Sequence, residues 1–470
     1  MPTTSSTSDR RHLPSWRVEE LRTTLWLVPV FCIAAAVLLF VGTYQLDQAV
    51  YRGSIQLPWF IRTGSADAGR AVLIGIAAAV ITVVGLVFSI TIVALTLASQ
   101  QFGPRMLRSF IRDVGTQMTL GVFVGSFMYA VLTLGSITTQ PRGEFVPHIS
   151  ITIAELLMVV DVGVLIYFIH HVARTIQLPE VIARVARDLG RAIDESYPVR
   201  LADAPPADAE GDGRDRKEVE VLLGKISRTG VPVPSRRSGY LQVVGYGQLV
   251  RIAEAADGVI YLSRRVGHFV LAGRPLALVW PPDAAPKVAR ALDKAHITGP
   301  YRTLAQDPVF PIDQLVEIGI RALSPAVNDT FTALTCIDWV SEGLCNISGR
   351  ALAEGVYRDR RGRVRLVEVA HSYERIVNRA YDKVRQSSKG MPAVLIRLVD
   401  SINHVIEYTT SDAQRHVLLR QAEMILREAR ASVVEEKDLS DIISRYEYLC
   451  ATSGRLERGE TAPLVWSGDR

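Results

Sequence analysis

The chain has 470 residues, of which 48% are hydrophobic and 21% are charged, and its mean hydropathy is +0.18. Soluble proteins carry roughly 25% charged residues, so this composition excludes a wholly soluble enzyme and indicates membrane-spanning segments. The four cysteines are too scattered for a disulfide framework, which excludes a small secreted scaffold, and a net charge of +5 is too small to indicate nucleic acid as a partner.

Four apolar segments in the first third of the chain are long enough to cross a hydrocarbon core, which needs about 20 helical residues. They lie near Thr24–Tyr44, Ala71–Ser99, Gly115–Thr138 and Ile149–Ile169. The arm before the first segment is too long and too charged for an ordinary signal peptide. We therefore expect an N-terminal arm over residues 1–23 and a four-span transmembrane domain over residues 24–171.

The arginines of the loops predict the orientation in the membrane. The N-terminal arm and the loop after the second span are rich in arginine, whereas the loop after the third span has only Arg142, offset by Glu144. Positively charged loops stay on the cytoplasmic side. We therefore expect a multi-pass protein of the cell inner membrane, in contact with the lipid bilayer, with both termini in the cytoplasm.

The second span carries a stripe of small and hydroxyl residues. Steps of three and four, broken only at Ile92, place these residues on one helix face: Gly75, Ala78, Thr82, Gly85, Ser89, Thr96 and Ser99. In lipid such a face favours close packing against a neighbouring helix of the bundle, which is the interpretation we favour. The alternative is that Thr82, Ser89 and Thr96 line a hydrated ion path in a homo-oligomer.

The fourth span contains two acidic residues, Glu155 and Asp161. A charge near the middle of a span costs a few kcal/mol, and such residues often mark ion or proton routes. Six positions along a helix place the two side chains about 120° apart, so they do not share one face. Asp161 therefore either belongs to an ion path or bonds to a hydroxyl such as that of Tyr129, and Glu155 lies nearer the interface.

The rest of the chain predicts a soluble region. It begins with a connecting helix over residues 172–200 and a flexible linker over residues 201–217, which has no periodic apolar pattern. Short strands around one helix predict a small α/β module over residues 218–284, and residues 285–470 are predicted to be a helical cytoplasmic domain. The expected fold class is mainly α, with a four-helix transmembrane bundle and a C-terminal cytoplasmic α+β domain.

The motifs of common enzyme chemistry are absent from the sequence. It contains no phosphate-binding glycine loop, dinucleotide fingerprint, zinc-protease motif or nucleophile elbow. His170 and His171, the only adjacent histidines, point about 100° apart on a helix and make a poor chelate. We therefore expect no catalytic residue, no metal site and no cofactor, and we do not expect an enzyme.

One block of the helical region concentrates charged and hydroxyl side chains. Its candidate site residues are Arg302, Asp307, Arg321, Asn328, Asp329 and Thr332. We expect them to lie together around the turn Ser324–Asp329, where Asn328 or Asp329 can cap the helix that starts near Thr330. The block is either a structural corner held by arginine–carboxylate pairs or a binding site for an anion, a nucleotide or a partner subunit.

Four ordered motifs also carry a family resemblance. They are FSITIVALTLASQQFGPRMLRSFIRD from Phe88, IYFIHHVA from Ile166, SGYLQ from Ser238 and RALSPAVNDTFTALTCID from Arg321. Together they resemble the bacterial family of predicted inner-membrane proteins called domain of unknown function 2254, over nearly the whole chain. The resemblance implies the layout of four spans and a cytoplasmic domain, and it supplies no activity, substrate or catalytic residue.

The sequence leaves two functions, of which we favour the first. The first is an oligomeric ion channel or transport protein with a cytoplasmic regulatory domain, which requires several subunits because four spans alone make a thin pathway. The second is a non-transporting membrane scaffold or sensor whose cytoplasmic domain binds a ligand or partner. Asp161 discriminates between them, because it is wet in a channel and sealed against a hydroxyl in a scaffold.

Cysteine substitution tests the predicted orientation. Cysteines placed at Ser65 and Gln140 should react with a membrane-impermeant thiol reagent added to intact cells, because both positions lie in loops that are expected to face outward. A cysteine at Ser109 should stay unlabelled until the membrane is permeabilised. Labelling of position 109 in intact cells would reverse the orientation.

Overall fold

The computed structural model describes residues 27–54, 64–102, 113–140, 143–197, 213–350, 355–369, 372–409 and 411–458. The chain divides into two units within helix α7 (Leu178–Ser196), one ending at Val181 and the other starting at Ile182. The two units have separate hydrophobic cores. Residues 103–112 of the arginine-rich loop after the second span and most of the predicted linker lie outside the described residues.

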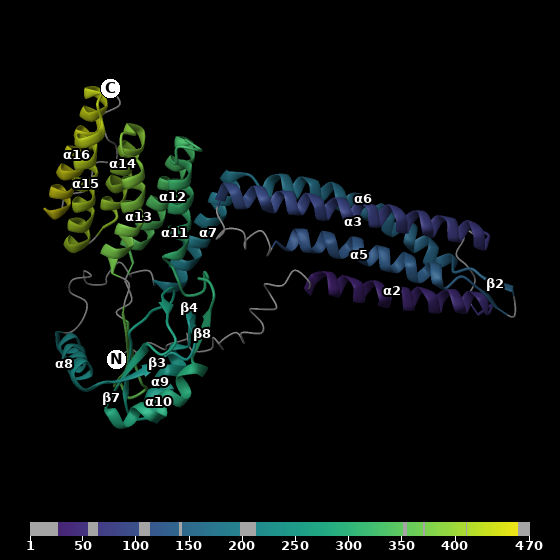
Figure 1. Cartoon of the computed structure of the whole chain (residues 1–470), viewed down its shortest axis with the longest axis horizontal. Helices are drawn as coiled ribbons and strands as arrows, with labels where there is room; N and C mark the ends of the chain where they lie inside the picture. The colour runs from purple at the N-terminus through teal and green to yellow at the C-terminus, as the bar shows by residue number, and fades with distance from the viewer. Residues whose placement is uncertain are drawn as a thin grey trace. The chain divides into compact units, whose positions relative to one another are not determined.

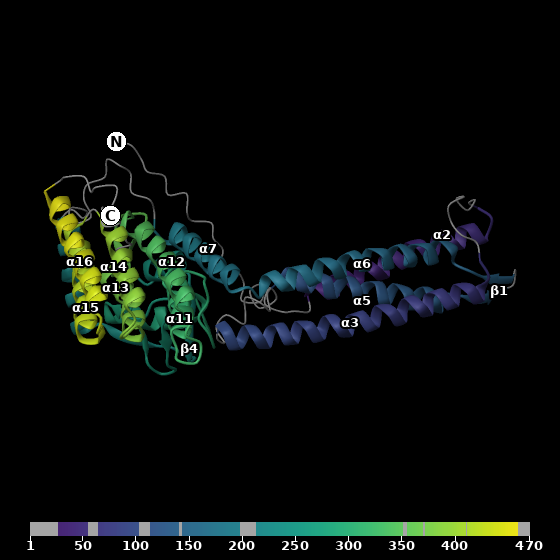
Figure 2. The ribbon, with the colours of Figure 1, turned by 90° about the horizontal axis from the view of Figure 1, so that it is seen from above.

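The described residues of the membrane unit form four long helices and one short hairpin (Figure 1). The helices are α2 (Leu27–Tyr51), α3 (Ala66–Phe102), α5 (Val114–Gly135) and α6 (His148–Thr175), and the hairpin strands are β1 (Thr138–Gln140) and β2 (Gly143–Phe145). All four helices are long and apolar enough to cross a membrane, which confirms the four predicted spans. They run side by side in both views (Figures 1 and 2).

Helix α5 is the central helix of the membrane unit, since it contacts α2, α3 and α6. Its Gly121 and Gly125 lie against α2: a Cβ at Gly121 would come within 2.7 Å of Cys32 Sγ, and one at Gly125 within 3.2 Å of the Cys32 carbonyl oxygen. Small residues allow two helix backbones to approach in this way in lipid. The pair of glycines therefore serves helix packing.

The C-terminal unit contains two small sheets. The first has five strands in the order β3-β7-β5-β10-β9: β3 (Val231–Pro234), β7 (Pro275–Trp280), β5 (Val259–Leu262), β10 (Val364–Glu368) and β9 (Val356–Arg358). Only the β5–β10 pair is parallel. The second sheet is antiparallel, in the order β6 (Phe269–Val270), β4 (Gly239–Val244) and β8 (His296–Gly299). Helices α8 (Gly213–Thr229), α9 (Tyr246–Ala255) and α10 (Ala285–Ala291) contact the five-stranded sheet.

The helical region of the same unit follows these sheets. It consists of α11 (Phe310–Ala322), α12 (Thr330–Ser348), α13 (Tyr373–Ser387), α14 (Pro392–Glu407), α15 (Asp412–Ser432) and α16 (Glu436–Glu457). In Figures 1 and 2 these helices lie side by side, and α7 lies next to α12. Leu189 of α7 fits against Gly343 of α12, where a Cβ would overlap it.

The strands of the C-terminal unit extend beyond the module that the sequence predicts for residues 218–284. Strand β8 pairs with β4, and β10 pairs in parallel with β5, although both later strands come from residues assigned to the helical region. The hairpin formed by β9 and β10 therefore completes the five-stranded sheet. This pairing joins segments about a hundred residues apart, which periodicity along the chain does not reveal.

The contact between α2 and α5 gives a stability prediction. Gly121→Ala should lower the stability of the protein in detergent by about 1–3 kcal/mol, because the new methyl group must displace Cys32 or the Pro29 backbone. Gly163→Ala on α6 is the matched control, since no atom lies within 4 Å of its Cβ position. Equal thermal unfolding midpoints for the two variants would contradict the close α2–α5 packing.

Candidate functional site

The buried polar residues of the membrane unit make contacts at three points along α6. These points are Ser150, Asp161 and His171, and each one bonds to a residue outside α6. At 1.5 Å of rise per residue, neighbouring points lie about 15 to 17 Å apart along the helix. The side chains at one point therefore cannot bond directly to those at the next.

At the first point, Asp47 of α2 caps the N-terminus of α6. Its carboxylate accepts hydrogen bonds from the backbone N–H groups of Ile149 (2.8 Å) and Ser150 (3.0 Å) and from Ser150 Oγ (2.7 Å). Ser150 Oγ also lies 3.0 Å from Thr43 Oγ1, which lies 2.9 Å from Tyr129 Oη. Asp47 thus supplies the acceptor that the exposed N–H groups of a helix N-terminus require.

At the second point, Asp161 lies inside the bundle and is 4% exposed. Ser126 Oγ of α5 donates a hydrogen bond to Asp161 Oδ1 over 3.0 Å, while Oδ2 is buried without a partner among the described residues. The expected hydroxyl partner is therefore Ser126 and not Tyr129, which bonds to Thr43 instead. Glu155 is only half-buried, and no described residue bonds to its side chain.

At the third point, His171 of α6 bonds to Asp113, the residue that caps α5. His171 Nε2 lies 2.6 Å from Asp113 Oδ2, and the same oxygen accepts bonds from the backbone N–H and the hydroxyl of Thr116. The ring of Tyr167 stacks on the imidazole with centroids 5.4 Å apart. This contact fastens the start of α5 to the end of α6.

The stripe of small residues on α3 faces away from the other helices of the membrane unit. Its described members are exposed, and no atom lies within 4 Å of the Cβ positions of Gly75 and Gly85. The hydroxyls of Thr82 and Thr96 donate to their own helix backbone. Our interpretation of the stripe as packing inside the bundle is therefore wrong, because bulkier residues such as Leu73 fill the core.

A pocket of about 370 Å³ opens beside Asp47. Among its lining residues, Glu144 and His148 carry side chains that can be charged, whereas the Asp47 carboxylate already accepts three hydrogen bonds as the α6 cap. The described residues contain no group of three histidine, cysteine, aspartate or glutamate side chains placed to hold a metal ion.

In the C-terminal unit, Arg302 is held between two carboxylates at the start of α11. Its Nη2 lies 2.7 Å from Asp307 Oδ2, its Nη1 lies 2.5 Å from Asp313 Oδ2, and its guanidinium lies 4.8 Å from the centre of the Phe310 ring. Burial lowers the pKa of Arg302, but the two carboxylates raise it by more, so its pKa lies above the usual value. The pair of acids therefore keeps this half-buried arginine charged.

The other predicted site residues of this unit lie at the opposite end of α11, with Arg321 in its last turn and the rest beyond it. Asp329 caps α12 by accepting bonds from Thr332 N (3.1 Å) and Thr332 Oγ1 (2.6 Å), and Asn328 forms the turn with a φ of +49°. Helix α11 rises about 12 Å from its first turn to Arg321. The six residues therefore form two groups rather than the single cluster that we expected.

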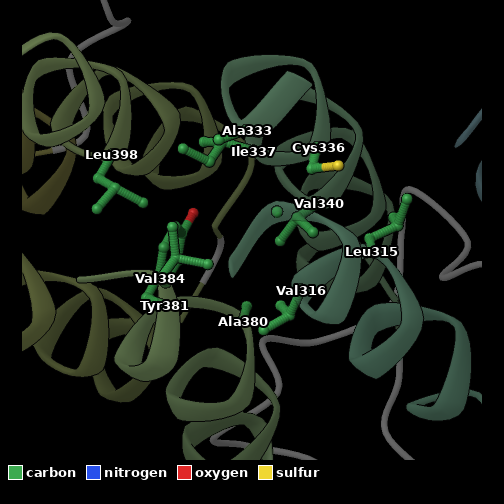
Figure 3. A pocket seen from close by; sticks show the side chains of 11 residues that line it. Leu315, Val316, Ala333, Cys336, Ile337, Val340, Ala380, Tyr381, Val384 and Leu398 are labelled. Carbon is green, nitrogen blue, oxygen red and sulfur yellow. The ribbon is translucent and has the colours of Figure 1, made fainter. Parts of the chain in front are cut away.

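A cavity between α11, α12, α13 and α14 offers no room for a ligand. Its lining residues, which include Cys336, Val340 and Tyr381, are drawn in Figure 3. Its volume is about 10 Å³, which is close to the minimum for one water molecule. Burial raises the pKa of Cys336 to about 12, so the thiol is not poised as a nucleophile.

We call Arg302, Asp307 and Asp313 the Arg302 corner. Sequence reasoning missed a cluster of arginines beside it. We define the arginine cluster as Arg264, Arg265, Arg375 and Arg379. The first two follow strand β5 and the last two lie on α13, more than a hundred residues later. Arg379 Nη1 lies 3.4 Å from Asp313 Oδ2, and Arg265 interacts electrostatically with Arg375, Arg379 and Asp307. The adjacent pair Arg264-Arg265 is the only local signal in the sequence, and it does not identify α13 as the partner.

Comparison with known proteins bears on the whole chain. The family model described as predicted membrane protein (DUF2254) matches residues 22–404. The chain belongs to the DUF2254 family. Uncharacterized proteins of Mycobacterium bovis and Mycobacterium tuberculosis are each 30% identical to it over 442 residues, which cover 91% of this chain and 80% of each relative. No solved structure matches the chain.

The Arg302 corner gives a second stability prediction. Asp307→Asn should lower the free energy of unfolding by about 3–5 kcal/mol, because it removes the carboxylate that pairs with a largely buried arginine. Asp338→Asn is the matched control. Its pair with Arg397 is exposed on both sides, so the change should cost less than about 1 kcal/mol. Equal losses in a thermal unfolding experiment would contradict the structural role of the corner.

Proposed function

We propose that this DUF2254 protein is a non-transporting membrane sensor or scaffold. The four-helix membrane unit anchors it, and the C-terminal unit binds a ligand or partner. The observation that carries the proposal is the burial of Asp161, which bonds to Ser126 inside the bundle while the polar stripe of α3 lies on the outside. The proposal includes no catalytic step.

The packing between the polar points supports a sealed bundle. Phe123 and Phe168 lie between Asp161 and the Asp113–His171 contact, and each is at most 1% exposed. Ala154, on the other side of Asp161, is also 1% exposed. A continuous ion path needs polar groups or water at each step. Neighbouring polar contacts along α6 lie about 15 Å apart, and the apolar side chains between them interrupt an ion path within one chain.

We place the protein in the cell inner membrane with both termini and the C-terminal unit in the cytoplasm. The support is the distribution of arginines between the loops, since positively charged loops stay on the cytoplasmic side. In this arrangement the Asp47 cap faces the outer side and the Asp113–His171 contact faces the inner side. The C-terminal unit then has access to cytoplasmic ligands.

The second candidate function is an oligomeric ion channel. The exposed stripe of α3 favours it, because a face of glycine, alanine and hydroxyl residues suits close contact with another subunit. Thr82, Ser89 and Thr96 would then line a path between subunits of a homo-oligomer. In this arrangement Asp161 lies away from the path, so the acid that suggested a channel is no longer part of it.

Ion flux in proteoliposomes distinguishes the two functions. For a sealed anchor we expect the flux of K⁺, Na⁺ and H⁺ to equal that of protein-free liposomes, both for the wild type and for Asp161→Asn. Glu155→Gln is the matched control, because it also removes one acid from α6 but at a half-buried position. A cation flux that Thr82→Val or Ser89→Ala changes would support the channel and contradict the sensor proposal.

A further inference from the structure

The arginine cluster combines a buried side with an exposed side. Arg265 is 7% exposed and Tyr197, at the end of α7, is 2% exposed, whereas Arg264, Arg375 and Arg379 are exposed. Tyr197 interacts electrostatically with both Arg265 and Asp307, which places it next to the cluster and the Arg302 corner. The cluster is therefore open to solvent on one side and closed by protein on the other.

Positive charge exceeds negative charge in this region. Among the described residues, Asp307, Asp313 and Glu368 are the acids that the structure shows interacting with the cluster or with Arg302. Glu374, which precedes Arg375, pairs with Arg420 instead. Asp307 and Asp313 are already bound to Arg302, and no described acidic residue pairs with the guanidinium of Arg375. Burial and then the neighbouring arginines lower the pKa of His268 to about 4, so this histidine adds no charge at neutral pH.

The position of Arg375 is unfavourable without an anion. It lies in the first turn of α13, where the helix dipole favours negative charge, and Arg379 follows one turn later on the same face. Two arginines at this spacing repel each other, and each also faces Arg265. The Ser372 hydroxyl already accepts the Arg375 N–H as the α13 cap, so the two guanidinium groups on one face are the donors that suit a phosphate.

The buried side offers a hydroxyl that no described residue bonds to. Tyr197 Oη is fully buried and has no hydrogen-bond partner among the described residues. A buried hydroxyl left unpaired costs free energy, so such groups normally have a partner. Gly267 allows the β5–β6 loop to approach Asp307. Its φ is +86°, and a Cβ at this position would overlap the Asp307 carboxylate.

We propose that the arginine cluster binds a phosphate-bearing anion, with Arg375 and Arg379 on the exposed side and Arg265 and the Tyr197 hydroxyl on the buried side. Guanidinium groups pair with phosphate oxygens through two hydrogen bonds, which suits several arginines around one tetrahedral group. The phosphate can come from a free cytoplasmic compound or from a phospholipid headgroup. This inference rests on the proposed function, because it gives the ligand class of the C-terminal unit.

Binding to the full chain in phosphatidylcholine nanodiscs tests the inference. Pyrophosphate, titrated by calorimetry, is the probe for a free phosphate compound, and nanodiscs that also contain phosphatidic acid, compared by thermal unfolding, are the probe for a lipid headgroup. We expect saturable pyrophosphate binding, stabilisation by phosphatidic acid, or both. The probe that gives a response identifies whether the phosphate belongs to a free compound or to a lipid headgroup.

Variants show whether the response comes from this cluster. Arg375→Gln with Arg379→Gln should weaken the response at least about tenfold, because each lost guanidinium removes a charge-assisted hydrogen bond. Arg360→Gln, which removes one exposed charge from the β9–β10 turn, should leave it unchanged. Tyr197→Phe should weaken binding without lowering the unfolding midpoint of the ligand-free protein, since its hydroxyl has no hydrogen-bond partner among the described residues.

The inference is overturned if neither probe gives a response, or if the double arginine variant and Arg360→Gln respond equally. Neither result bears on the non-transporting proposal, which the flux measurement tests. Conversely, cation flux through the wild type would overturn that proposal and leave the anion-binding result in place. The two failures are therefore distinguishable.

Discussion

A polar group inside a membrane-spanning bundle must find its partner within the protein, because lipid tails cannot provide one. The membrane unit meets this constraint by pairing residues of different helices. Asp47 of α2 caps α6, Ser126 of α5 bonds to Asp161 of α6, and Asp113 bonds to His171. These bonds hold α2, α5 and α6 in register, and Asp161 Oδ2 is the one oxygen of the three acids buried without a partner among the described residues.

The C-terminal unit uses charge in a different way. At the Arg302 corner, two carboxylates neutralise one arginine in a largely buried setting, as a structural contact requires. Beside it, the arginine cluster combines repelling charges with a buried tyrosine hydroxyl that has no partner in the described part of the chain. Such an arrangement lowers the stability of the ligand-free protein and favours binding of an anion. We therefore assign a structural role to the Arg302 corner and a binding role to the arginine cluster.

The layout of the protein was predictable from the sequence because it follows from local patterns. Runs of apolar residues predicted the four spans. Short segments of alternating apolar and polar residues, bounded by turn residues, predicted most strands of the C-terminal unit. The pairing of β10 with β5 was not predictable, since it joins segments that are distant in the chain. Periodicity also placed the α3 stripe on one face correctly, but it could not determine whether that face meets another helix or the surroundings.

The candidate sites show the same limit. The sequence singled out Asp161 as a buried acid but not Ser126 as its partner, because that choice depends on how α5 and α6 are aligned. It grouped Arg302 with Asp329 because they are close in the chain, whereas α11 separates them. It overlooked Arg375 and Arg379, since their significance depends on Arg265 and Tyr197 from other elements.

The central claim is that the polar contacts inside the membrane unit are closed to water. The most direct measurement is the reactivity of a cysteine at Ser126 with a small water-soluble thiol reagent, read by mass spectrometry of the protein in liposomes, with Ser65→Cys as the exposed control. The account predicts no labelling at position 126 from either side of the membrane and complete labelling after unfolding in detergent. Labelling at position 126 in the folded protein at the rate of position 65 would contradict it.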